Sequence, residues 1–437
     1  MIGLDLSDIG LAPADTAPAV DEAVEETAPA QDDRLIIGSV LSKALYSVWS
    51  GQPVTIVDSP PGAGKTTLLV DLAEHLMNRT DLKVIVATPT RAGAADVAGR
   101  MGEAIGLDAN NLPQVVLGIK DLETPNEFVL GHGAGSALGR TLTVRTVASC
   151  TYSPPKCDVL IVDEAYQSTF ANVSTAAENA DQIIMVGDPG QIGPVVQTAG
   201  RMFAGRKVSP EHRAPEAFRL IHDCQLLALR TTYRLGQDTV DAIAPLYGFD
   251  FDSSRPDRWL EDVYGNRIDE VRAVQMPATG SYTDITSVQN AVDRAVRFIG
   301  MTLAETQPDG TVTRRVLQDS DVAIVAAHNA QVTAATAMLD TRGHKDITAG
   351  TADSLQGGQW QAVVALDPLV GHATAGPHQL APGRLCVMAS RHMTSLVWMF
   401  EEGWADALLD DQIDSREADL GRVVRSRLTS GEVEILG

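Results

Sequence analysis

The segment SPPGAGKTT at residues 59–67 has the residue types and spacing of a phosphate-binding loop. It follows a β-branched apolar run at residues 54–57 and precedes the helical pattern LLVDLAEHLM. Backbone N–H groups of such a loop surround a β-phosphate, while a lysine reaches the β and γ oxygens and a hydroxyl binds Mg²⁺. Ser59 departs from the pattern, which has glycine there. We predict a nucleoside triphosphate site formed by Pro61, Gly62, Ala63, Gly64, Lys65, Thr66 and Thr67, with Thr66 as a Mg²⁺ ligand.

A pair of acids follows the apolar run VLIV at residues 159–162. Asp163 would hold Mg²⁺, in most cases through its water shell, and Glu164 would orient and deprotonate the attacking water. Paired acids after a strand are often only solvated loop residues. Because the phosphate loop lies upstream at a spacing that parallel strands of one sheet allow, we favour the catalytic role.

The elements that must position these residues are apolar β-rich runs alternating with helical stretches, a pattern typical of a parallel sheet covered by helices. They predict two successive α/β units. We expect an exposed polar excursion at residues 250–266 and, at residues 131–140, a flexible surface loop rather than a ligand-binding loop. The candidate strands are residues 54–57, 84–87, 159–162, 183–186, 322–326 and 362–366.

Composition restricts the class of protein further. The 437 residues carry 34 Lys+Arg against 57 Asp+Glu, a net charge of −23, which argues against a histone-like coat on nucleic acid but does not describe the charge inside one groove. Residues 1–33 hold nine of the acids and no basic residue, so we predict a disordered acidic tail. The four cysteines lack metal-site spacing. No apolar run approaches the roughly 18 residues of a membrane span, and no secretory signal is present, so we expect no membrane partner and a cytoplasmic location.

Six further segments resemble motifs of superfamily 1 helicases, and they occur in the order of that family. The form DEAYQ of the paired acids and the form TADSLQG at residues 351–357 resemble the 5′-to-3′ branch that contains the nonsense-mediated-decay helicase and its relatives. The segments are ATPTR at 87–91 (motif Ia), VRT at 144–146 (a weaker motif Ic), MVGDPGQIGPVV at 185–196 (motif III), LRTTYR at 229–234, AGTADSLQGGQ at 349–359 (motif V) and RLCVMASR at 384–391 (motif VI).

This resemblance implies an α/β fold of two tandem RecA-like P-loop domains, each with a parallel sheet, and an ATP cleft between them. The first would span residues 34–228 and the second residues 229–437. Besides Lys65 and Glu164, the catalytic residues that it implies are Gln191, which senses the γ-phosphate, and the arginine fingers Arg234 and Arg391. The nucleotide contacts that it adds are Tyr233 as an adenine-stacking aromatic, Gly357 and Gln359.

The arginine fingers and Tyr233 each have an alternative interpretation, and Gln359 departs from the pattern of the family. An arbitrary arginine would form a surface ion pair, and Tyr233 could be a buried core residue. The branch usually has an acid where this chain has Gln359, and residues 39–43 lack the expected adenine-reading glutamine. We therefore predict ATP as the substrate with weak discrimination against GTP and CTP.

In the related enzymes a single strand crosses both domains, held by backbone amides and hydroxyls that contact phosphates without reading bases. A structural role is the alternative for His328. Residues 197–224 carry a local basic cluster, Arg201, Arg206, Lys207, Arg213 and Arg219, which is either a strand contact or an exposed connector. The positions that match strand contacts of the family are Pro89, Thr90, Arg91, Thr146, His328, Asn329, Thr351 and Ser354.

These motifs favour an ATP-dependent helicase, a nucleic-acid-dependent ATPase that translocates 5′ to 3′ and unwinds duplex. The expected partner is single-stranded DNA or, as the alternative, RNA, and a protein loader or activator is a further candidate. The second hypothesis is a P-loop ATP-binding switch or scaffold without motor activity. Motifs V and VI favour the first hypothesis because a simple switch has no need of Arg391 and the Gln356-Gly357 loop.

Overall fold

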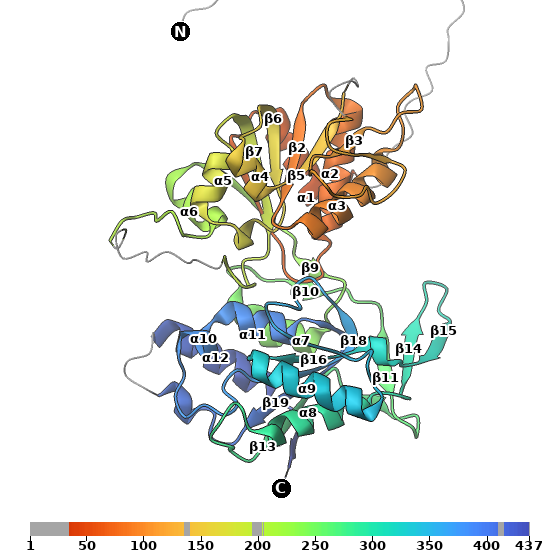
Figure 1. Ribbon diagram of the computed structural model, residues 1–437, viewed down its shortest axis with the longest axis vertical. Coiled ribbons are helices and arrows are strands. Elements are labelled where there is room, and N and C mark those ends of the chain that lie inside the picture. Colours follow the sequence, from red (N-terminus) through yellow and green to blue (C-terminus); the bar gives the residue numbers. More distant parts are fainter. Residues whose placement is uncertain (1–34, 135–139, 195–202, 204, 410–414, 437) are drawn as a thin grey trace, which may run out of the picture.

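The chain folds into two α/β halves, one above the other (Figure 1). The computed structural model describes residues 35–134, 140–194, 203, 205–409 and 415–436. The predicted acidic tail at residues 1–33, the centre of the glycine-rich loop at 131–140 and the end of the motif III segment at 195–196 lie outside the described residues. In the described part of the chain, no helix has the length and apolar character that crossing a membrane requires.

The first half is built on an eight-stranded sheet in the order β4-β3-β5-β2-β6-β7-β1-β8, and all its neighbouring strands are parallel. The strands are β1 (Val54–Asp58), β2 (Val84–Thr88), β3 (Val115–Leu117), β4 (Val129–Leu130), β5 (Leu142–Thr146), β6 (Cys157–Val162), β7 (Ala180–Gly187) and β8 (Cys224–Ala228). Their side chains alternate between two faces. Val57 packs under the helices α1 (Val40–Trp49), α2 (Lys65–Arg79) and α3 (Arg91–Ile105), whereas Ile56 packs under α4 (Val147–Tyr152), α5 (Phe170–Ala176) and α6 (Ala214–Ile221).

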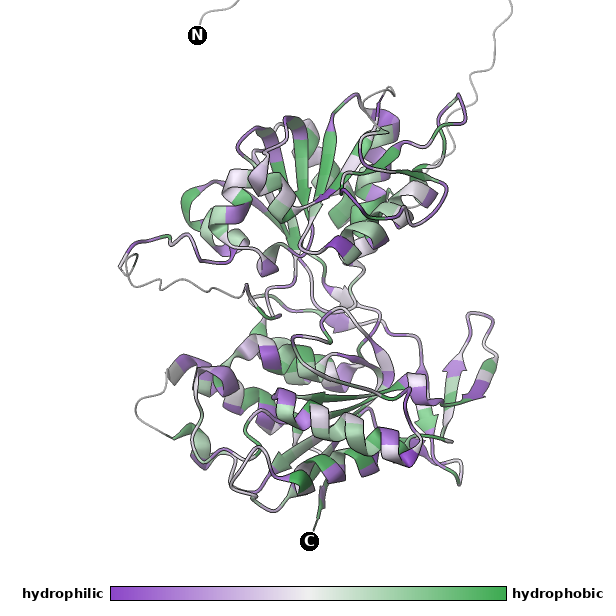
Figure 2. Ribbon diagram, viewed as in Figure 1, coloured by the Kyte–Doolittle hydropathy of each residue, from purple (hydrophilic) through white to green (hydrophobic). Residues whose placement is uncertain are grey.

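The second half contains a six-stranded parallel sheet in the order β17-β16-β18-β19-β13-β20. Its strands are β13 (Val271–Met276), β16 (Val322–Ala326), β17 (Thr348–Thr351), β18 (Trp360–Leu366), β19 (His392–Glu401) and β20 (Val433–Ile435). One face packs against α7 (Gln237–Ile243), α11 (Pro382–Ala389) and α12 (Ser415–Leu428), the other against α8 (Ile285–Arg297) and α9 (Asn329–Arg342). The strands of both sheets are mostly hydrophobic, while purple patches are common on the helices and loops around them (Figure 2).

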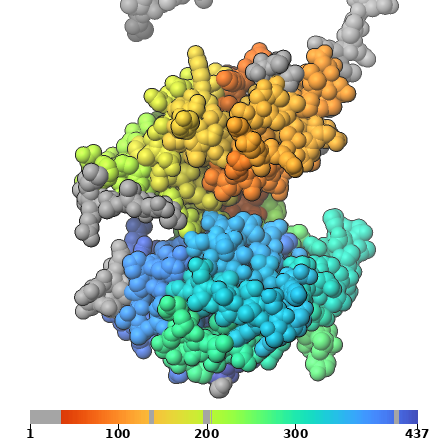
Figure 3. All heavy atoms as spheres, viewed as in Figure 1, coloured from red at the N-terminus to blue at the C-terminus, as the bar shows by residue number. Residues whose placement is uncertain are grey.

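These sheets confirm the predicted fold class of two parallel-sheet α/β units. Each of the six predicted strands is present, with β16 matching residues 322–326 and β1 extending one residue further to Asp58. Figure 3 shows the atoms of the second half lying directly beneath those of the first. The segment between the sheets contains β9 (Thr231–Thr232), which pairs with β10 (Asp252–Ser253).

The prediction of an exposed excursion at residues 250–266 is wrong in part. This segment supplies β11 (Arg258–Glu261) to a small antiparallel sheet with β12 (Arg267–Ile268), β14 (Thr302–Thr306) and β15 (Val312–Val316). Leu260 and Arg258 are buried. The guanidinium of Arg258 donates to the carbonyls of Tyr233 and Arg234 at 3.3 and 3.2 Å, so this polar segment supports the chain that joins the two halves.

Candidate nucleotide site

The phosphate loop lies between β1 and the first turn of α2. Gly62 and Gly64 have φ of +73° and +85°, the left-handed region that glycine adopts without strain. Ser59, which departs from the sequence pattern, is buried, and its N–H donates to the carbonyl of Gly187 at 2.9 Å, which ties the loop to the end of β7. The first N–H groups of α2 have no acceptor within the helix, as at every helix start, so they can bind an anion.

Carboxylates from two neighbouring strand ends surround Lys65. Its Nζ lies 2.6 Å from Oε1 of Glu164, and Asp163 and Asp188 are both buried close by. Burial lowers the pKa of Lys65, but the charges of Glu164, Asp188 and Asp163 outweigh it and the pKa is raised. Burial, followed by the charge of Glu164, raises the pKa of Asp163 to about 7. The site thus holds more buried negative charge than Lys65 alone neutralises.

The residues present fit a Mg²⁺–nucleotide complex. Carboxylate and hydroxyl oxygens are the ligands that Mg²⁺ prefers, and the half-buried Thr66 and the buried Asp163 provide them. A divalent cation would stabilise the ionised form of Asp163, whose pKa is high because of its acidic neighbours. The assignment of Thr66 and Asp163 as the Mg²⁺ ligands stays a prediction from the motifs.

The chain that enters the second half lies directly on the phosphate loop. The N–H of Tyr233 donates to the carbonyl of Gly62 at 2.9 Å, and the hydroxyl of Thr232 donates to the carbonyl of Pro61 at 2.7 Å. A β-carbon at Gly62 would overlap Cβ of Arg234. The glycine is therefore required both for its backbone angle and for this contact.

The two predicted arginine fingers are brought together beside the loop. Burial and then the charge of Arg391 lower the pKa of Arg234 to about 10, and burial lowers the pKa of Arg391. Within the described residues, the guanidinium of Arg234 donates to the carbonyl of Ser390 at 3.5 Å, and that of Arg391 to carbonyls of Val387 and Gly358 and to the hydroxyl of Ser390. A half-buried and a buried guanidinium group that repel each other favour an anion between the halves.

Gln191, within the motif III segment, joins the two halves. It is buried, its Nε2 donates to Asp188 at 2.7 Å, and its Oε1 accepts from Nε2 of Gln356 at 3.1 Å. The hydroxyl of Tyr247 also donates to Asp188, at 2.9 Å. Arg213 donates to the carbonyls of Pro189 and Gln191. Asp188 and Tyr247 were not predicted as site residues, although Asp188 lies inside the motif III segment.

The other predicted nucleotide contacts lie near this junction. Tyr233 is 58% exposed, so the alternative of a buried core tyrosine is wrong and its ring is accessible. Gly357 and Gln359 are exposed, with Gly357 at φ +89°, and the intervening Gly358 accepts the hydrogen bond of Arg391. Residues 39–43 form the start of α1, with Ser39 as its N-cap.

The predicted strand contacts of the first half gather at the carboxyl ends of β2 and β5. Thr90 and Thr146 cap α3 and α4, accepting from the N–H groups of Gly93 and Ser149. Pro89 precedes Thr90, and the exposed Arg91 donates to the carbonyls at residues 120 and 121 at 3.0 Å. Because Thr88 pairs with Thr146, the two sets of residues lie side by side.

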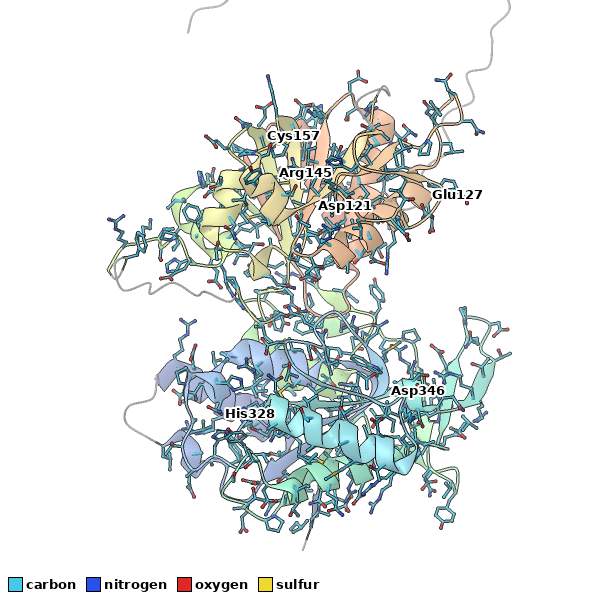
Figure 4. All side chains as sticks on the ribbon, in the orientation of Figure 1. Asp121, Glu127, Arg145, Cys157, His328 and Asp346 are labelled. Carbon is cyan, nitrogen blue, oxygen red and sulfur yellow. The ribbon has the colours of Figure 1, made fainter. Side chains whose placement is uncertain are left out.

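The predicted contacts of the second half gather at the carboxyl ends of β16 and β17. Thr351 pairs with Ala326, two residues before His328, and its hydroxyl bonds Ser354. His328 precedes α9, whose first residue, Asn329, is exposed. Figure 4 shows His328 in the lower half and Asp121, which accepts from Arg91, in the upper one.

The basic cluster between motif III and residue 229 divides into two groups. Arg206 and Lys207 are exposed, and Arg201 lies outside the described residues. Arg219 instead donates to both carboxylate oxygens of Asp58, at 2.5 and 2.6 Å, and to the hydroxyl of Tyr166. Arg213 donates to the carbonyls of Pro189 and Gln191, as described above. Two of the five basic residues, Arg213 and Arg219, therefore form hydrogen bonds that support the nucleotide site. Sequence spacing held no signal for the Asp58–Arg219 pair.

Comparisons with known proteins agree with this geometry for the first half. A protein-family model described as AAA domain matches residues 42–221, which contain the phosphate loop, the DEAYQ segment and the GDPGQ segment. No protein of curated function matches the chain in sequence. Residues 42–221, fewer than half of the 437 residues, are therefore similar to an AAA domain.

Among solved structures, the chain is similar to helicases of arteriviruses. The PRRSV helicase is 16% identical, with 82% of this chain and 54% of that one covered and a TM-score of 0.42. Arterivirus nonstructural protein 10 (helicase) is 17% identical, with 85% and 65% covered and a TM-score of 0.45. The structure of arterivirus nonstructural protein 10 (helicase) in complex with DNA is 16% identical, with 89% of this chain and 66% of that one covered and a TM-score of 0.44. This chain spans about half to two thirds of the length of those proteins.

Proposed function

We propose that this protein is an ATP-dependent helicase that translocates 5′ to 3′ on a single strand and unwinds duplex. In this proposal residues 34–228 and 229–437 are two RecA-like domains, after an acidic tail at residues 1–33, and ATP with Mg²⁺ binds between them. The strand is DNA, with RNA as the alternative.

One observation carries the proposal: the half-buried Arg234 and the buried Arg391 lie together, Arg234 against Gly62 of the phosphate loop. Both arginines belong to residues 229–437, the part of the chain that follows the first sheet. A guanidinium that reaches the γ-phosphate from a second domain makes hydrolysis depend on how the two domains sit, and in other NTPases it is worth about 10³–10⁵ in rate. Hydrolysis can thus be coupled to movement between the halves.

Each of the other catalytic residues has a role that its position supports. Lys65 contacts the β and γ oxygens, Thr66 and Asp163 hold Mg²⁺, and Glu164 orients and deprotonates water. Mg²⁺ would neutralise charge on the triphosphate oxygens. Gln191 senses the γ-phosphate; its bond to Gln356 offers a route by which the nucleotide site reaches the motif V loop.

The strand would contact two sets of residues. The set in the first half is Pro89, Thr90, Arg91 and Thr146, and the set in the second half is His328, Asn329, Thr351 and Ser354. The supporting observation is that each set gathers at one sheet edge. Polarity rests on the motif resemblance. Weak base discrimination rests on Gln359 in place of the family's acid and on the lack of a glutamine at residues 39–43. Equal hydrolysis of ATP, GTP and CTP within about tenfold would support the latter; a hundredfold preference for ATP would contradict it.

The test of the proposed function is unwinding of duplexes that carry a single-stranded tail, in DNA and in RNA and with either tail polarity. We expect ATP-dependent unwinding of 5′-tailed substrates. Unwinding only from 3′ tails would contradict the polarity alone. ATP hydrolysis that no strand stimulates, together with no unwinding, would favour the switch or scaffold without motor activity.

A further inference from the structure

Four rings meet at the carboxyl edge of the second sheet, and only His328 among them is a predicted strand contact. We call Tyr282, His328, His372 and His378 the ring cluster. The ring of Tyr282 lies 4.4 Å from that of His328 and is parallel to that of His372, at 5.3 Å and 4°. His378 stacks on His328 at 5.0 Å and 18°. Nε2 of His328 lies 2.9 Å from Nε2 of His372.

Surrounding contacts hold the cluster in place. Glu401 accepts from the N–H and the hydroxyl of Thr279 and from the N–H of Gly371, which ties the two loops that carry Tyr282 and His372 to the end of β19. A β-carbon at Gly371 would overlap the backbone of Tyr282. The rings are therefore arranged by the fold and need no ligand to bring them together.

Two rings present open surface. Tyr282 is 39% exposed, and His378 is exposed on α10 (Pro377–Leu380). The carbonyl of His378 accepts from Arg384, which is itself buried and pairs with Asp353 at 3.2 Å. Asp353 lies between Thr351 and Ser354, so the open rings adjoin the loop that carries the predicted phosphate contacts.

The chemistry of the cluster is that of neutral rings. Burial, then the charges of His378, His372 and Arg384, lower the pKa of His328 to about 4, and burial lowers the pKa of His372 and His378. At neutral pH the cluster therefore holds little charge for a phosphate. Within the described residues, no group of three or more His, Cys, Asp or Glu side chains could hold a metal ion. Apolar π faces beside a phosphate-binding loop suit a nucleobase.

We propose that the open faces of Tyr282 and His378 stack on bases of the bound single strand while Thr351 and Ser354 hold its phosphates. This rests on the proposed function, because it assumes that a strand crosses the second sheet edge. The stacking site would bind any base, since every base has a π face. It would make part of the strand affinity independent of phosphate charge.

The test is equilibrium binding of a fluorescent single strand by the full chain, wild type against Tyr282→Ala, His378→Ala and the double variant. Tyr282→Phe is the matched control because it keeps the ring. Each strand is compared with one of equal length in which consecutive central nucleotides lack their bases, at several salt concentrations. Thermal unfolding of each variant confirms that it is folded.

On the strand with bases, we expect each alanine variant to lose about 5- to 150-fold in affinity, the range for one stacked base. The salt slope should not change, and Tyr282→Phe should stay within about twofold of wild type. On the abasic strand, wild type and variants should bind equally. Equal losses on both strands, or a smaller salt slope in the variants, would overturn the stacking site and indicate phosphate contacts. Unchanged affinity of the double variant would also overturn it. A wild-type protein that binds neither strand would overturn the proposed function, and this inference with it.

Discussion

Nε2 of Gln356 donates a hydrogen bond of 3.1 Å to Oε1 of Gln191, across the junction of the two halves. Gln191 is held from the other side by Asp188, which also accepts from Tyr247. Asp188, whose charge acts on Lys65 of the phosphate loop, is therefore linked through Gln191 to the motif V loop. A change in the position of Gln191 cannot leave Gln356 unaffected.

Substitution of this pair should weaken coupling more than nucleotide binding. We expect Gln356→Ala to reduce the stimulation of ATP hydrolysis by a single strand several-fold. Gln191→Ala should reduce it more strongly, because this variant also loses the hydrogen bond to Asp188. In a double-mutant cycle the two effects should be non-additive by about 0.5–1.5 kcal/mol, the net value of one hydrogen bond. Strictly additive effects would mean that the bond transmits nothing.

Glu164→Gln should abolish turnover while keeping strand binding. The amide cannot take a proton from water, and loss of a general base typically costs about 10²–10⁴ in rate. The ion pair with Lys65 also disappears, which frees its ammonium for phosphate. Nucleotide affinity should therefore be kept or rise. Lys65→Ala is the contrasting variant and should lose nucleotide affinity. Loss of strand binding in Glu164→Gln would show that the assigned role is wrong.

Arg219→Met should lower the stability of the first half rather than its affinity for nucleic acid. Removal of this cation leaves the carboxylate of Asp58 largely buried without its ion pair, and we expect a loss of about 1–3 kcal/mol in the free energy of unfolding. The matched control is Arg100→Met, which breaks the exposed pair with Asp96 and should cost less than about 0.5 kcal/mol. Urea unfolding measures both. Equal effects would contradict the structural role of Arg219.

Glu270 should make stability depend on acid pH. Burial raises the pKa of its carboxyl, but hydrogen bonds and charge from His392, with Arg255 and Thr239, outweigh burial and lower it to about 2. The unfolded chain has the ordinary value, near 4.5, so it binds the proton more readily than the folded chain. The stabilisation is thus complete above pH 4.5 and is lost as the pH falls towards 2. Glu270→Gln should flatten this part of the profile in urea unfolding. An unchanged profile would exclude Glu270 as the source.

The sequence predicts the parallel sheets well because a buried strand such as β16 needs a continuous apolar run, which stands out from its surroundings. The phosphate loop is equally visible because its glycines need positive φ. The small sheet was missed because β11 lies among Asp, Arg and Ser residues and buries Arg258, whose partners are carbonyls close in space but not marked by any motif.

Contacts between side chains far apart in the chain were also out of reach. Nothing in the residue types around Asp58 or Arg219 marks them as partners across 161 positions, and Arg219 looked like a surface cation. The ring cluster is similar: His328 could be placed at a strand end, but its neighbours come from the loop before α8, the loop after β18 and the helix α10. Tertiary packing alone decides such pairs.

The central claim is that Arg234 and Arg391 act from the second half on a triphosphate held by the first, and that a single strand controls this. Single-turnover ATP hydrolysis, with and without a single strand, tests it most directly in wild type, Arg234→Ala and Arg391→Ala. We predict that a strand accelerates wild-type hydrolysis and that each variant loses about 10³-fold or more in rate while its nucleotide affinity changes less than about tenfold. Wild-type hydrolysis that ignores both DNA and RNA, or variants with wild-type rates, would contradict the account.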